Sequence, residues 1–166
     1  MELISSTFQE VVIMTTQTHT TQTHTPDHAA GSVPVARTGL VLVLAVIVAV
    51  AVNAVVAWVA RGAGATPGFP PLTVPVFGAF TLVGVLVGWA GWRIIEHRSA
   101  RPGRLLGWLV PVVGVLSFVP DVALGLLRFI PGATWPGALG LMVMHVVVIV
   151  IAVPAYLIAG RPATSR

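Results

Sequence analysis

The run TGLVLVLAVIVAVAVNAVVAWVA, residues 38–60, decides the fold of this chain. Its 23 residues carry no charge, and at about 1.5 Å per residue they are long enough for a helix to cross about 30 Å of hydrocarbon. Three similar runs follow at residues 72–92, 105–127 and 138–159. Short connections rich in Gly and Pro favour antiparallel neighbours. The sequence predicts an all-α membrane protein, a four-transmembrane-helix up-down bundle.

The composition supports a membrane protein. Of 166 residues, 56% are apolar and only 8% are charged, whereas a soluble domain carries roughly 25% charged residues. This excludes an ordinary soluble enzyme. The absence of cysteine excludes thiol redox chemistry and disulfides. No motif indicates a cofactor or nucleic acid, and the expected surroundings are the lipid bilayer.

All nine positive residues are arginines, and they lie at the ends of the apolar runs. Two of them, Arg61 and Arg128, fall on one side of the membrane. The other seven fall on the opposite side: Arg37, Arg93, Arg98, Arg101, Arg104, Arg161 and Arg166. By the positive-inside rule, both termini are expected to be cytoplasmic in a bacterial plasma membrane. The first run is too long for a signal-peptide core, so it is expected to remain.

Residues 1–37 differ from the rest of the chain. They contain the tandem pentapeptide TQTHT at residues 16–25 and little that could form a core, which predicts a disordered cytoplasmic tail. His19, His24 and His28 with Asp27 could hold a metal weakly, but a solvated tail is the simpler interpretation. Met1 and Met14 are both candidate translation starts. Residues 38–160 are the expected transmembrane domain, and residues 161–166 a short cytoplasmic tail.

Polar side chains inside the spans are the main functional signal, because an ionisable group at mid-membrane costs about 2.5–3.5 kcal/mol on insertion scales. Asp121 and His145 are such groups. Asn53, Ser117 and Thr81 are the next most polar. Asn53, Asp121 and His145 fall at a similar depth, and Thr81 only slightly deeper, in the half of the membrane that the arginine count places outside. We expect these residues to form an outward-facing site for a small ligand, an ion or a proton.

The third run has a local reason to form such a site. Ser117 and Asp121 are four residues apart and share a helix face. Pro120 has no amide proton, which frees the carbonyl of Leu116. In a membrane these groups need partners from other helices, water or a ligand, and His145 and Asn53 are the obvious candidates.

Two other functions stay open at this stage. In a structural role, Asp121 pairs with Arg128 and His145 only fixes the helix register. A structural or accessory subunit would dock on itself or on another membrane protein through small residues such as Gly84 and Gly88. A membrane enzyme could use an Asp and a His for acid–base catalysis, but no substrate motif supports it, so a non-enzymatic protein is expected.

The pattern as a whole resembles an uncharacterised family of small actinobacterial four-helix integral membrane proteins, known only as a domain of unknown function. The resemblance covers roughly residues 38–160. It is carried by Asn53, the Pro-rich loop through Pro75, the run SFVPD at 117–121, and MHVV at 144–147 continuing to Pro154. The long Thr- and His-rich tail departs from the compact family form. The resemblance implies a fold and a membrane location but no activity.

Overall fold

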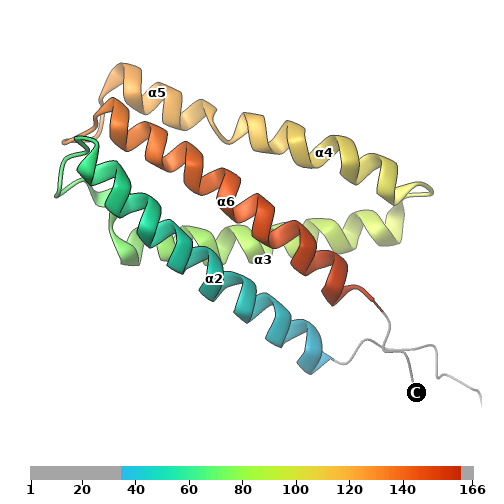
Figure 1. Ribbon diagram of the computed structural model, residues 1–166. Helices are drawn as coiled ribbons and strands as arrows, with labels where there is room; N and C mark the ends of the chain where they lie inside the picture. The colour runs from blue at the N-terminus through green and yellow to red at the C-terminus, as the bar shows by residue number, and fades with distance from the viewer. Residues whose placement is uncertain (1–34, 162–166) are drawn as a thin grey trace, which may run out of the picture. The chain divides into compact units, whose positions relative to one another are not determined.

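The computed structural model describes residues 35–161. Residues 1–34 of the expected tail, with its histidines, lie outside this range, and residues 35–37 begin the first helix. The described residues form helices only: α2 (Val35–Gly62), the 3-10 turn η1 (Pro70–Leu72), α3 (Val74–Arg98), α4 (Pro102–Leu116), α5 (Val119–Leu127) and α6 (Trp135–Ala159). Figure 1 shows α4 and α5 following one another as a single broken segment. With these two joined, four segments are long and apolar enough to cross a membrane. The predicted all-α, four-span fold is confirmed.

The ends of the helices follow from the turn residues. Helix α2 ends where Gly64 adopts φ 104°, a left-handed conformation that glycine adopts at little cost, and the amide of Ala65 donates to the carbonyl of Ala60 at 2.9 Å. Thr134 caps the amino end of helix α6, and its hydroxyl accepts from the amide of Gly137 at 3.3 Å. Both turns lie at the same end of the bundle (Figure 1).

The most extensive helix contact joins α2 to α6, and small residues make it. Ala49, Ala57 and Ala60 on α2 are buried, as are Gly137 and Gly140 on α6. A Cβ atom built on Gly140 would lie 2.9 Å from the Cβ of Ala60. Lipid tails are as apolar as leucine, so helices in a membrane associate through close packing of this kind.

Two clusters of buried apolar residues fill the described part of the bundle. One surrounds Phe69, Leu72 and Phe77, at the end of the bundle where η1 lies. The other surrounds Val85, Trp92 and Tyr156 near the opposite end. The buried side chains of Asn53 and Thr81 lie between residues of the two clusters along their helices. On α2, Asn53 lies between Leu42 and Ala57, and on α3, Thr81 lies between Phe77 and Val85.

The segment expected as one span at residues 105–127 is two helices in the structure. Helix α4 ends at Leu116 and α5 begins at Val119. Pro120 explains the break, because the amide that would bond the Leu116 carbonyl in a continuous helix is absent. The chain passes this point through a turn in which the amide of Phe118 donates to Val115 at 3.1 Å.

We expect Gly140→Leu to lower the free energy of unfolding by about 1–3 kcal/mol, because overpacking at this point forces α2 and α6 apart. Thermal unfolding in mild detergent measures the loss. Gly107→Leu on α4 is the matched control, since a Cβ built there meets nothing within 4 Å. Equal stability of the two variants would contradict the importance of the α2–α6 contact.

Candidate functional site

Asp121 lies in the first turn of α5, directly after Pro120. Its residue exposure is only 5%, although an aspartate in a membrane span is costly to bury. The break at Ser117 and Phe118 starts a new helix there, and the amino end of a helix favours a negative charge. The local sequence therefore both buries this carboxyl group and supports its charge.

His145 on α6 faces this carboxyl group. Its Nδ1 atom lies 2.9 Å from the carbonyl oxygen of Leu141 and 3.1 Å from Oδ2 of Asp121. A carbonyl only accepts, so Nδ1 carries a proton and donates it to Leu141. Only that carbonyl meets the geometry of a hydrogen bond, and Oδ2 of Asp121 consequently has no donor within residues 35–161. Asp121 and His145 are therefore close, but Oδ2 of Asp121 lacks a hydrogen-bond donor among the described residues.

The surroundings of the imidazole ring differ from those of the carboxyl group. The side chain of His145 is 41% exposed, whereas that of Asp121 is 8% exposed. The ring of Phe118, at the break between α4 and α5, contacts the imidazole edge to face with 6.5 Å between centroids. The imidazole of His145 is therefore partly exposed at the surface of the helix bundle, while the carboxyl group of Asp121 is enclosed by protein.

Asn53 and Thr81 form a second polar pair, between α2 and α3. The Asn53 amide nitrogen donates to the Thr81 hydroxyl at 3.3 Å, and the two residues are 1% and 4% exposed. Oδ1 of Asn53 is buried and has no donor in the described part of the chain. Each pair thus leaves one buried oxygen free to accept a hydrogen bond.

Four of the five residues of the expected site form these two pairs, and Ser117 belongs to neither. Asp121 lies with His145 and Asn53 with Thr81, and no hydrogen bond or ion pair joins the two pairs within residues 35–161. The Ser117 hydroxyl donates to the carbonyl of Gly114 in its own helix at 2.6 Å. Two buried acceptors without donors can take a proton, a cation, or the N–H or O–H group of a ligand.

Arg128, the alternative partner of Asp121, does not pair with it in the described structure, where Arg93 pairs with Glu96 and the Asp121 carboxyl group lies beside the His145 imidazole. It caps the carboxyl end of α5 with φ 47°, a left-handed conformation, and its side chain is exposed. No group of three acidic or histidine side chains in residues 35–161 could hold a metal ion.

The sequence model of a family of unknown function, DUF6069, matches residues 32–162, most of the chain. The chain belongs to this family. Membership confirms the resemblance of this chain to an uncharacterised domain family. No curated protein and no solved structure matches the chain.

One feature of this DUF6069 chain is not apparent from its sequence. An apolar cavity of about 250 Å³ lies between α3, α4 and α6. Gly84, Gly88 and Gly91 line its α3 wall, and these glycines were the only sequence signal. They indicated close helix packing, but a Cβ built on Gly84 or Gly91 meets nothing within 4 Å. Only Gly88 is closely approached, by the hydroxyl of Tyr156.

We expect Arg128→Gly to raise the free energy of unfolding by about 1 kcal/mol, because glycine relieves a left-handed backbone. Arg128→Ala keeps the backbone strain and removes the charge, so its stability should match the wild type. Chemical unfolding in detergent micelles measures both. A loss of stability in both variants would show that Arg128 is the charge partner of Asp121 after all.

Proposed function

We propose that the protein is a non-enzymatic, multi-pass protein of a bacterial plasma membrane that binds a proton or a small cation at Asp121 and His145. The observation that carries this proposal is the buried Asp121 carboxyl group, which has an oxygen without a donor beside a half-exposed imidazole. Asn53 and Thr81 are a second acceptor pair, and Ser117 supports the turn that positions Asp121.

The chemistry of the pair explains why a proton is the preferred ligand. Nδ1 of His145 already donates to Leu141, so the second proton enters on Nε2 and makes the ring an imidazolium. The cation then lies 3.1 Å from the Asp121 carboxylate and compensates a buried charge. Helix α6 carries no other charged side chain, and Arg128 on α5 is exposed and not paired with Asp121. Protonation therefore strengthens the contact of α5 with α6.

We expect the purified protein to be more stable at pH 5 than at pH 8 by about 1 kcal/mol, the size of a partly exposed ion pair. The imidazolium present at pH 5 attracts the carboxylate, and the neutral ring at pH 8 does not. Asp121→Asn and His145→Gln should each abolish the difference. Thermal unfolding of each protein at the two pH values provides the measurement.

His97→Gln is the matched control, because His97 is exposed at the carboxyl end of α3 and should not affect the response. Repeating the scans in sodium, potassium and choline salts separates a proton from a small metal cation. A pH response that persists in both Asp121→Asn and His145→Gln would overturn the proposed site.

The alternative function is a structural subunit that acts through helix contacts, as a homo-oligomer or with another membrane protein. The exposed Gly84 supports this alternative, because another helix could pack against it. Gly88 is less available, because the Tyr156 side chain of the same chain packs against it. The pH measurement distinguishes the two, because a purely structural subunit gives no reason for a response that depends on both Asp121 and His145.

The proposed orientation, with both termini cytoplasmic, rests on the arginine distribution. We expect a fluorescent protein fused after Arg166 to be bright, and alkaline phosphatase fused there to be inactive. Phosphatase inserted between residues 66 and 68 should be active, because this loop is then outside. The reverse pattern would place Asp121 and His145 in the cytoplasmic half of the membrane.

A further inference from the structure

The apolar cavity between α3, α4 and α6 lies apart from the polar pairs. Its α3 wall runs from Gly84 to Ile95, and its α4 wall from Leu106 to Val113. Asp121 and His145 are not part of its lining. The cavity is partly open to the outside of the bundle, and at about 250 Å³ it is larger than the roughly 150 Å³ that holds benzene in a soluble protein.

The cavity exists because α4 packs less closely on α6 than α2 does. Helix α4 approaches α6 at Gly114, where a built Cβ would lie 3.0 Å from Cδ1 of Ile149. Between Gly114 and the amino end of α4, the glycines that line the α3 wall leave space where larger side chains would contact α4. The cavity is therefore closed at one end by the Gly114–Ile149 contact.

Its polar atoms are already paired with protein groups. The Tyr156 hydroxyl donates to the Val85 carbonyl at 2.7 Å, and the Trp92 indole donates to Glu96 at 2.9 Å. The other lining residues are Gly, Ala, Val, Leu and Ile. An apolar cavity of this kind does not hold water, and it offers no hydrogen bond to a polar ligand. A ligand that fills this cavity therefore has to be apolar, as a hydrocarbon chain is.

The depth of the cavity matches one leaflet of a bilayer. From Gly84 to Ile95, α3 rises about 16 Å, close to half of the roughly 30 Å of hydrocarbon. The wall ends beside the loop between α3 and α4. An acyl chain that fills the cavity would therefore place its headgroup at this loop.

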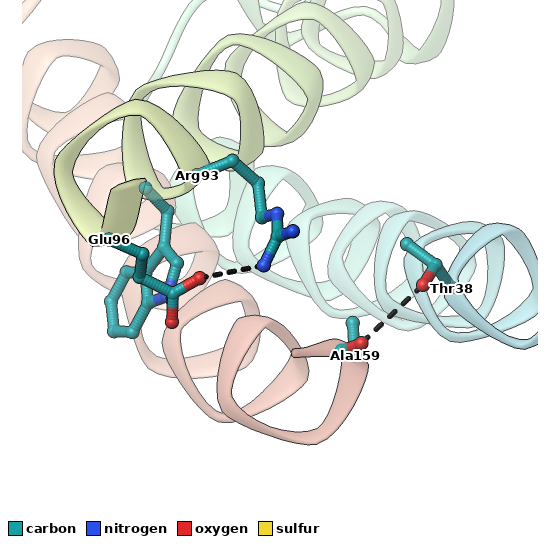
Figure 2. Close-up of polar contacts among 5 residues, drawn as sticks. Thr38, Arg93, Glu96 and Ala159 are labelled. Atoms are coloured by element: carbon teal, nitrogen blue, oxygen red, sulfur yellow. Dashed lines mark hydrogen bonds and ion pairs between the residues drawn. The ribbon is translucent and has the colours of Figure 1, made fainter. Parts of the chain in front are cut away.

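Charge at the loop selects the headgroup. Arg98, Arg101 and Arg104 are exposed there, and none forms an ion pair with a carboxylate in the part of the chain that the structure describes. Glu96, the nearest acid, is paired with Arg93 at 3.0 Å (Figure 2). The mouth of the cavity thus presents uncompensated positive charge, which complements a phosphate.

We infer that the cavity between α3, α4 and α6 binds one acyl chain of an anionic glycerophospholipid, whose phosphate contacts Arg98, Arg101 and Arg104. Lipid chains surround the bundle on all sides, so the apolar wall alone gives no preference over the bulk bilayer. Filling a void that water cannot enter restores lost packing contacts, and the arginines supply the selectivity.

The test uses the full chain in vesicles of three parts phosphatidylcholine to one part phosphatidylglycerol. The protein is extracted in mild detergent and washed, and the retained lipids are identified by native mass spectrometry. We expect the wild type to retain a single phospholipid, enriched in phosphatidylglycerol over the vesicle composition. Gly91→Leu and Gly84→Leu should lose it, because each fills the cavity without a clash at its Cβ.

Gly107→Leu is the matched control, since this exposed glycine of α4 is outside the cavity lining and should retain the lipid. Changing Arg98, Arg101 and Arg104 together to Gln should leave the cavity intact but reduce the preference for phosphatidylglycerol by up to roughly a hundredfold, because each arginine near an anionic headgroup contributes about fivefold. This variant also decides the question if a leucine variant fails to fold.

Three results would overturn the inference. The first is a wild type that retains no lipid, and the second is retention unchanged in both Gly91→Leu and Gly84→Leu. The third is a wild type with the mass of two chains that Gly91→Leu reduces to one, which would assign the cavity to a second copy of the chain.

Discussion

Close contact between α2 and α6 sets the arrangement of the other helices. Because burial against lipid-like side chains gives no driving force in a membrane, the contact depends on the absence of bulk at Ala60 and Gly140. Helix α3 packs on both of these helices, while α4 and α5 make fewer contacts with the rest. They are held at Gly125, where Trp135 packs, and at Gly114. The remaining length of α4 stands off and leaves the cavity.

The break at Pro120 places the charged residue. In a continuous helix through residues 102–127, Asp121 would lie in the helix interior and not near an amino end. The missing amide ends α4 and gives Asp121 the first turn of α5, where the amino end of the helix supports a negative charge. Burying this carboxyl group costs free energy, and the imidazole of His145 compensates this cost only in part.

The helices could be predicted from the sequence because each must satisfy its own backbone in lipid, which requires about 20 apolar residues in a row. The polar residues could be named, but not paired, since hydropathy does not fix how a helix is rotated about its axis. For this reason the sequence could not show that Asn53 contacts Thr81 rather than Asp121. The four-residue spacing of Ser117 and Asp121 predicts a shared helix face, but the helix breaks between them and the Ser117 hydroxyl donates to the Gly114 carbonyl of α4. The glycines of α3 were visible, but a small residue fits close packing and an open cavity equally well.

The polar pair and the apolar cavity lie on opposite sides of the same break. The cavity wall on α4 ends at Val113, and Asp121 begins the polar site one turn beyond Ser117 and Phe118. Where Pro120 interrupts the hydrogen bonds of the helix, bending costs less than in an intact helix. The break therefore separates Asp121, on α5, from the α4 wall of the cavity. Helix α6 still connects the two, because His145 lies one turn before Val148 and Ile149 of the cavity lining.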